Sequence, residues 1–192
     1  MFVARKSAAP RSRSSRRPRS SSASPVRFAL ATASMPTIVS CMDSLKPAGD
    51  AIVFTDHAGE ESPGLTFVAR THARRPLYTS AAGKTLLANV PDDEMYRLLA
   101  LASPEQAGEV RQFLAELPEI RSRRLAFNPG ATFQDAFAVA TPLLAPDGSL
   151  IAAISAAVDP AEADRLDDLG EELKKAVATL GPRYGLEPRR AG

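Results

Sequence analysis

The sequence predicts an α+β domain built around an antiparallel sheet. Short β-prone runs come first, helical patterns fill the middle, and two longer apolar runs followed by an amphipathic helix close the chain. Strands that precede a group of helices, with a hairpin near the end, are typical of this class, whereas a parallel sheet needs strands that alternate with helices.

The first strands are expected in residues 37–42 and 51–55, which a loop with Pro47 and Gly49 separates, and a third in residues 65–70. A helix is then expected to begin near Thr79 or Ser80 and to run through residue 88. Pro91 opens a second helix, because the three acidic residues that follow it favour the positive end of a helix dipole.

The third helix has the clearest start signal in the chain. Ser103 as N-cap, Pro104 in the first turn and Gln106 form a capping box. One buried face then follows at helical spacing, made of Val110, Phe113, Leu114 and Leu117. After Pro118, an arginine-rich segment leads to the turn residues 128–130.

Two apolar runs, residues 136–144 and 150–158, are joined by Pro146-Asp147-Gly148, which predicts a β-hairpin. Asp159-Pro160 then caps a last helix that ends at residues 181–182. Its apolar stripe is formed by Leu166, Leu169, Leu173, Val177 and Leu180.

Charge divides the chain into a basic tail and an acidic body. Eight basic and no acidic residues occur up to Arg27, which leaves 16 basic against 22 acidic residues, a net charge of −6, for the rest. The tail has almost no large apolar groups, so we expect residues 1–28 to be disordered, 29–185 to form one domain and 186–192 to be a C-terminal tail. The tail is either an arm that contacts DNA phosphates or a frayed or misassigned N-terminus.

Several kinds of protein are not indicated. No apolar run is long enough for a membrane span, and the single Cys41 fits a reducing compartment, so we expect a cytoplasmic protein that does not contact membranes. His57 and His72 lie far apart and give no metal-ligand spacing, so neither a metal nor a cofactor is expected.

No motif indicates an enzyme, and we expect no catalytic residue. The run Gly83-Lys84-Thr85 resembles a phosphate-binding loop, but Tyr78 stands where that loop needs a glycine, so the run is better interpreted as an early helical turn. No Gly-x-Ser-x-Gly occurs, and paired carboxylates such as Asp92-Asp93 fall on polar helix faces.

A ligand cradle is the remaining hypothesis. The backbone N–H groups of a helix N-terminus bind carboxylates, and the small residues after Ser80 would allow a close approach. Ser155 is the one polar side chain in its run, so it either bonds to a neighbouring backbone group or points into a polar pocket.

Three segments in register resemble the effector-binding domain of the IclR family. Residues 75–88 (RPLYTSAAGKTLLA) are similar to that family's PLH-x-x-A-x-GKA-LLA pattern. Residues 119–121 and 125–128 are similar to its IR-x-x-G-Y-A-x-D, and residues 138–142 and 147–155 to its AIA-x-PV and G-x-VVAALSVS hairpin. The likeness spans about residues 30–182.

The resemblance implies a GAF-like fold, with a curved antiparallel sheet flanked by helices, in a dimer or tetramer that binds a small organic acid or aromatic metabolite. Carried over by position, the effector pocket would comprise Ala81, Ala82, Asn128, Ala138, Ser155 and Ala157. Asn128 stands where the family often has aspartate, Asp135 where it has glycine, and Ala157 where serine is frequent. The family's winged helix-turn-helix has no counterpart in the sequence given.

The sequence is therefore interpreted as the metabolite-sensing domain of an IclR-type transcription regulator, which acts through ligand-dependent oligomer arrangement. DNA would be contacted indirectly or through the basic tail. The alternative is an interaction module that co-assembles with full-length relatives without binding DNA itself.

Overall fold

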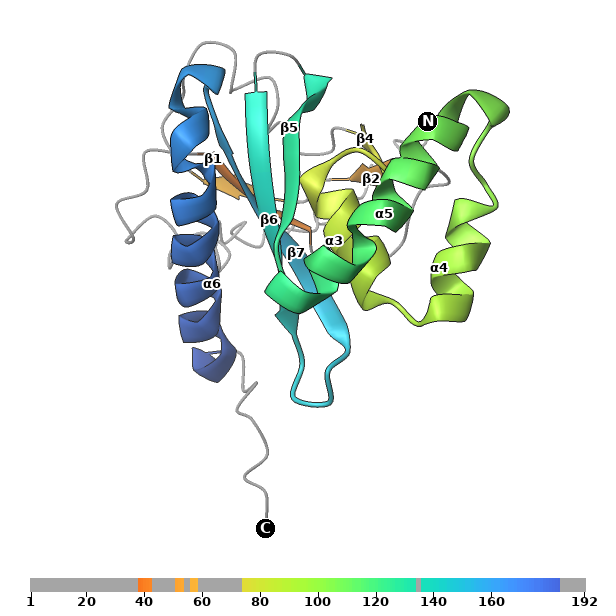
Figure 1. Ribbon diagram of the computed structural model, residues 1–192. Coiled ribbons are helices and arrows are strands. Elements are labelled where there is room, and N and C mark those ends of the chain that lie inside the picture. Colours follow the sequence, from red (N-terminus) through yellow and green to blue (C-terminus); the bar gives the residue numbers. More distant parts are fainter. Residues whose placement is uncertain (1–37, 43–50, 54–55, 59–73, 134–135, 184–192) are drawn as a thin grey trace, which may run out of the picture.

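The computed structural model describes residues 38–42, 51–53, 56–58, 74–133 and 136–183 (Figure 1). The predicted strand at 65–70, the two predicted tails and Asp135 lie outside these residues. The strands are β1 (Ile38–Met42), β2 (Ala51–Val53), β3 (Asp56–Ala58), β4 (Arg74–Pro76), β5 (Ala126–Phe133), β6 (Ala136–Leu144) and β7 (Leu150–Val158). The helices are α3 (Ala81–Asn89), α4 (Asp92–Leu99), η1 (Pro104–Gln106), α5 (Ala107–Arg123), η2 (Pro160–Arg165) and α6 (Leu166–Arg183).

Five strands form one antiparallel sheet in the order β3-β1-β7-β6-β5, and β2 pairs with β4 in a second, two-stranded sheet. The helices lie on both sides of the larger sheet, with α6 on one side and α3, α4 and α5 on the other (Figure 1). The predicted α+β class, with a GAF-like antiparallel sheet flanked by helices, is confirmed.

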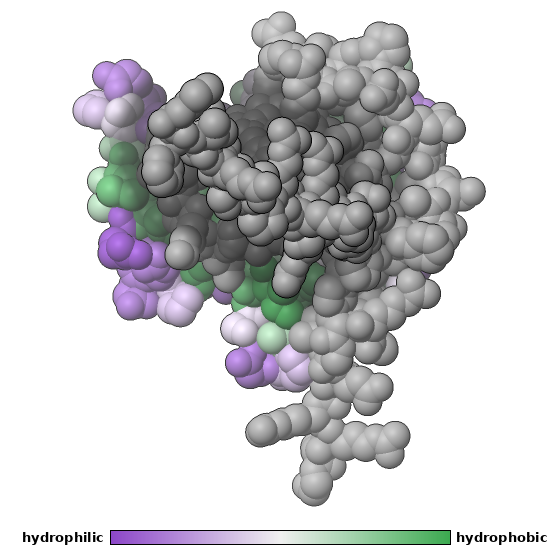
Figure 2. All heavy atoms as spheres, turned by 180° about the vertical axis from the view of Figure 1, so that it is seen from behind, coloured by the Kyte–Doolittle hydropathy of each residue, from purple (hydrophilic) through white to green (hydrophobic). Residues whose placement is uncertain are grey.

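The β6–β7 hairpin at the centre of this sheet has the predicted bounds. Gly148 adopts φ +86° in the turn, a value that glycine takes without strain, and its N–H donates to Ala145 O at 2.9 Å. The exposed tip is hydrophilic and the residues next to it are hydrophobic (Figure 2). Local turn chemistry therefore closes the hairpin, and burial of its two strands stabilises it.

The face of the sheet that α6 covers carries large side chains. Val139, Leu143, Ile154 and Val158 form one buried cluster with Leu125 and with Leu166, Leu169, Leu173 and Val177 of α6. The predicted apolar stripe of α6 is confirmed for these four residues. Asp159 accepts the Ala161 N–H at 2.8 Å and starts the helical segment, as its position predicts.

The opposite face carries small side chains under α3. Ala126, Ala140 and Ala153 belong to a second buried cluster with Ala81, Ala82 and the leucines of α3 and α4. Thr141 follows Ala140 on β6, so its side chain lies on the α6 face, where its hydroxyl donates to Arg124 O at 2.9 Å. On the α3 side, small residues of the strands thus pack against larger side chains of the helices.

One prediction in the middle of the chain is wrong, and the structure gives the third helix an end that the sequence left open. Residues 128–130 are part of β5 rather than a turn, because β6 offers them a pairing partner, and the turn-like geometry survives as an irregularity between Pro129 and Phe133. Helix α5 also continues through Pro118 to Arg123. Pro118 lies on the exposed side of the helix, and burial of Phe113 and Ile120 on either side of it holds the helix together.

Candidate functional site

The start of α3 is fixed by hydrogen bonds around Ser80. The Ser80 hydroxyl donates to Pro76 O at 2.6 Å and accepts the Gly83 N–H at 3.2 Å, which makes Ser80 the N-cap. The sequence predicts that this helix begins near Thr79 or Ser80. Gly83 is required here, because a Cβ atom at its position would lie 2.2 Å from Leu77 O. The Gly-Lys-Thr run is an early helical turn, as the sequence predicts.

The first two residues of α3 leave their backbone donors available. The Lys84 N–H donates to Ser80 O at 2.9 Å, but the N–H groups of Ala81 and Ala82 have no acceptor among the residues that the structure describes. Both alanines are at most 2% exposed, and α3 has no acidic side chain in its first turn. A buried helix N-terminus with free N–H groups can accommodate one negatively charged oxygen group.

A chain of polar side chains connects this helix start to β5. The Thr79 and Thr132 hydroxyls lie 3.2 Å apart, and Asn128 Nδ2 donates to Thr132 Oγ1 at 2.8 Å. Asn128 is one of the predicted site residues, whereas neither threonine is, since a hydroxyl next to an N-cap or within a strand is too common to stand out in a sequence. Asn128 also accepts the Ala131 N–H at 2.7 Å, so its amide holds the irregular part of β5 in place.

The four predicted strand residues lie on one face of the sheet. Asn128 pairs with Ala138 and Ala138 with Ala157, so these three form one row across β5, β6 and β7. Ser155 is two positions before Ala157 and lies in the next row, opposite Ala140. Its side chain is buried, and it forms no hydrogen bond with the rest of the described chain.

The six predicted residues therefore lie in the layer between α3 and the sheet, with Ala81 and Ala82 on the helix and the other four on the strands. Their role as ligand contacts stays a prediction. The layer offers buried amide donors and a serine hydroxyl, together with small apolar walls at Ala138 and Ala157.

Lys84 lies beside this layer and is already paired. Its side chain is 3% exposed, and its ammonium group donates to Glu116 Oε2 at 2.6 Å and to Phe127 O at 3.0 Å. Glu116 is held in turn by Gln112 Nε2 at 2.9 Å. Lys84 thus ties α3 to α5 and β5, and it is not a free cation for a ligand.

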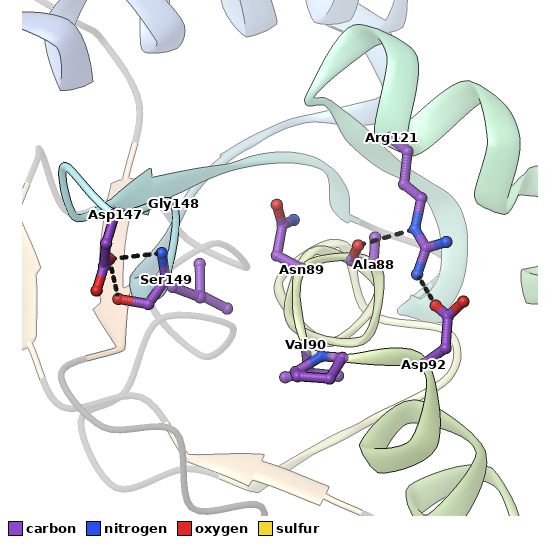
Figure 3. Close-up of a pocket in the computed structure, with 10 residues that line it drawn as sticks. Ala88, Asn89, Val90, Asp92, Arg121, Asp147, Gly148 and Ser149 are labelled. Carbon is purple, nitrogen blue, oxygen red and sulfur yellow. Dashed lines mark hydrogen bonds and ion pairs between the residues drawn. The ribbon is translucent and has the colours of Figure 1, made fainter. Parts of the chain in front are cut away.

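A cleft of about 620 Å³ opens at the other end of α3 (Figure 3). Asn89 and Val90 form one wall, and Asp147, Gly148 and Ser149 of the hairpin turn form the opposite one. Hydrogen bonds from the Ser149 hydroxyl and N–H hold the pKa of Asp147 below its usual range.

The basic group of this cleft is also engaged. Arg121 donates to Asp92 Oδ1 at 2.6 Å and to Ala88 O at 3.1 Å, while Asp147 adds a second carboxylate. The cleft therefore holds more negative than positive charge and is a poor site for an anion. Nothing in the sequence pointed to it.

The described residues contain no group of three or more His, Cys, Asp or Glu side chains that could bind a metal ion. Among the described helices, none combines the length and the apolar composition needed to cross a membrane.

The fold, an antiparallel sheet with helices on both sides, is of the kind found in the C-terminal domains of bacterial transcriptional regulators. Residues 46–181 match the family model described as "Bacterial transcriptional regulator IclR C-terminal", and the chain belongs to this family of transcriptional regulators. The identification confirms the resemblance seen in the sequence.

Individual relatives agree with this assignment. The chain is 32% identical over 116 residues to the probable transcriptional regulator SauR of Cupriavidus necator, a match that covers 58% of this chain and 46% of that protein. It resembles the repressor BlcR of Agobacterium tumefaciens with a TM-score of 0.68 and 22% identity, covering 84% of this chain and 68% of BlcR. The chain therefore spans less than half of SauR.

The inducer-binding domain of the PobR transcription factor from Acinetobacter, solved as a double mutant with 3-hydroxybenzoic acid, is also similar. The TM-score is 0.62 at 17% identity, covering 79% of this chain and 91% of that domain. At this level of identity the likeness concerns the fold.

Proposed function

We propose that this domain senses a small organic acid, aliphatic or aromatic, and that the acid binds between the start of α3 and the sheet. The observation that carries the proposal is the pair of buried N–H groups of Ala81 and Ala82, which have no acceptor within the described chain and lie at the positive end of α3. A carboxylate satisfies both donors and interacts favourably with the helix dipole.

The remaining groups of the layer would select the rest of the ligand. The Ser155 hydroxyl offers a hydrogen bond from the strand side, and Thr79 and Thr132 offer hydroxyls beside the helix start. Ala138 and Ala157 would give the ligand small apolar contacts, and Ala157 brings no hydroxyl of its own. That an acid is bound by the PobR domain, which shares this fold, supports the assignment.

Binding would control transcription by changing how subunits assemble. Lys84 connects the proposed site to α5, because its side chain reaches Glu116 on that helix and Phe127 O next to Asn128 on β5. A shift of α3 on binding would therefore move α5. Contact with DNA would be indirect or through the basic residues at the N-terminus. Light scattering with and without a bound acid would test the change in assembly.

The site is tested by thermal-shift screening of the whole chain against aliphatic and aromatic carboxylic acids, followed by calorimetry on those that stabilise it. Ser155→Ala is expected to weaken binding about threefold to tenfold, the value of one hydrogen bond. Ser149→Ala, at the opposite end of α3, is the matched control and should leave affinity unchanged. Failure of every acid in a broad panel to raise the melting temperature would refute the proposal.

A further inference from the structure

Thr85 in the middle of α3 has a hydroxyl without a hydrogen-bond partner in the part of the chain that the structure describes. The side chain is 1% exposed, and Thr85 Oγ1 makes no hydrogen bond to any other described residue. The buried Thr141 on the other side of the sheet differs, since its hydroxyl donates to Arg124 O at 2.9 Å. Buried polar groups in folded proteins nearly always have a partner, so the unpaired hydroxyl needs an explanation.

The position of Thr85 connects it to the proposed acid site. It lies four residues after Ala81 and three after Ala82, and residues at these spacings share one helix face. Ala88 and Asn89 continue this face and line the cleft opposite the turn of the β6–β7 hairpin (Figure 3). The Thr85 side chain is therefore on the face of α3 turned toward the β6–β7 hairpin.

Its direction along the helix follows from helix geometry. Every Cα–Cβ bond in an α-helix tilts toward the N-terminus, so Thr85 leans toward the turn that holds Ala81 and Ala82. The hydroxyl thus points toward the turn with the free N–H groups. The buried Ser155 lies on the sheet face that α3 covers and also makes no hydrogen bond within the described chain. Two buried hydroxyls and two amide donors share one layer.

We propose that Thr85 is a specificity-determining residue whose hydroxyl hydrogen-bonds to a second polar group of the acid. The inference rests on the proposed function: the carboxylate would occupy the Ala81 and Ala82 N–H groups, and a hydroxyl or carbonyl further along the ligand would satisfy Thr85. The preferred ligands are therefore hydroxy acids or oxo acids rather than unsubstituted carboxylic acids.

The test compares Thr85→Val, which keeps the shape and removes the hydroxyl, with Thr85→Ser, which keeps the hydroxyl. Thr141→Val is the matched control, because it removes a buried hydroxyl that does have a partner. Affinities are measured by calorimetry for two pairs of probes that differ by one hydroxyl, benzoate with 3-hydroxybenzoate and propanoate with lactate. Melting temperatures are measured without ligand.

The wild-type chain is expected to favour the hydroxylated member of at least one pair. Thr85→Val should reduce this preference about fivefold to tenfold, whereas Thr85→Ser should preserve it. Without ligand, Thr85→Val should raise the melting temperature, because it removes an unsatisfied polar group, and Thr141→Val should lower it.

An unchanged preference in Thr85→Val, or a lower melting temperature for that variant without ligand, would overturn the role of Thr85. Either result leaves the proposed function intact if Ser155→Ala still weakens acid binding. If no carboxylic acid binds the wild-type chain, the proposed function itself is wrong. The melting temperatures without ligand still test Thr85 by itself, so the failure of the proposed function and the failure of the role of Thr85 can be told apart.

Discussion

The two faces of the central sheet differ in what their side chains do. On the α6 side, Val139, Ile154 and Leu173 fill the space with large aliphatic groups and leave no buried hydroxyl without a partner among the described residues. On the α3 side, alanines alternate with Ser155, and Thr85 and the first N–H groups of α3 have no partner within the described chain.

The difference arises within single strands. Successive residues of β6 and β7 point to opposite faces, so Val139 and Ile154 serve the α6 core while their neighbours Ala138 and Ser155 lie under α3. Both faces are packed, but among the described residues only the α3 face carries buried polar groups that lack a hydrogen-bond partner. This contrast locates the proposed acid site on the α3 face, and it can be tested by variants on each side.

The largest effect is expected on the α6 face. Leu173 is fully buried, so Leu173→Ala should lower the free energy of unfolding by about 2–5 kcal/mol, as a loss of hydrophobic burial plus a cavity. Urea denaturation measures this. The exposed Lys175→Ala on the same helix should stay within about 0.5 kcal/mol of wild type. The acid affinity of the folded protein should not change. A large change in affinity would contradict the assignment of the acid site to the α3 face alone.

A similar loss is expected from one methyl group at the start of α3. Gly83→Ala forces a Cβ atom against the Leu77 carbonyl, which should cost about 1–3 kcal/mol or more and disturb the N–H groups of the site. Gly108→Ala is the control, because its Cβ would meet nothing closer than Arg111 at 4.0 Å. It should stabilise the helix by up to about 1 kcal/mol. Equal behaviour of the two variants in urea denaturation would contradict this explanation.

A smaller gain is expected where α5 ends. Arg124 has φ +55°, a left-handed conformation that glycine adopts at helix C-termini without strain. Arg124→Gly should raise the free energy of unfolding by about 0.5–1 kcal/mol, while Arg124→Ala, which keeps the strain, should not. Thermal unfolding of the three proteins checks this, and an increase for alanine equal to that for glycine would rule out backbone strain as the cause.

The smallest effect concerns the hairpin tip. The bonds from Ser149 lower the pKa of Asp147 in the folded chain, so their contribution is complete above about pH 4 and is lost as the pH falls through the folded-state value. An NMR titration of the Asp147 carboxyl should give a midpoint below 3.8, and Ser149→Ala should move it upward. A midpoint that Ser149→Ala leaves in place would show that these bonds are not formed in solution.

Local signals predicted most of the described fold. The N-cap at Ser80, the capping box at Ser103, with its N–H donating to Gln106 Oε1 at 2.9 Å, and the Asp147-Gly148 turn each depend on neighbouring residues alone. Residues 128–130 were misassigned because an Asn-Pro-Gly sequence forms similar hydrogen bonds in a turn and in a bulged strand. The pairing of β5 with β6 selects the strand, and this pairing cannot be predicted from residues 128–130 and their neighbours.

The candidate site was predictable to a smaller extent. The resemblance supplied Ala81, Ala82 and Ser155, which the fold places in one layer, but Thr79, Thr132 and Thr85 have no distinguishing local pattern. Thr79 and Thr132 are singled out by the hydrogen bond between them, and Thr85 by the absence of a hydrogen-bond partner within the described chain. Such contacts between distant segments require the folded chain.

The most direct test of the central claim is an amide chemical-shift titration of the ¹⁵N-labelled chain with the best carboxylic acid from the screen. We expect the largest shifts at the Ala81 and Ala82 N–H groups, followed by Ser155 and Thr132, while Asn89, Gly148 and Ser149 at the cleft change little. Largest shifts at the cleft residues, with Ala81 and Ala82 unmoved, would contradict the central claim.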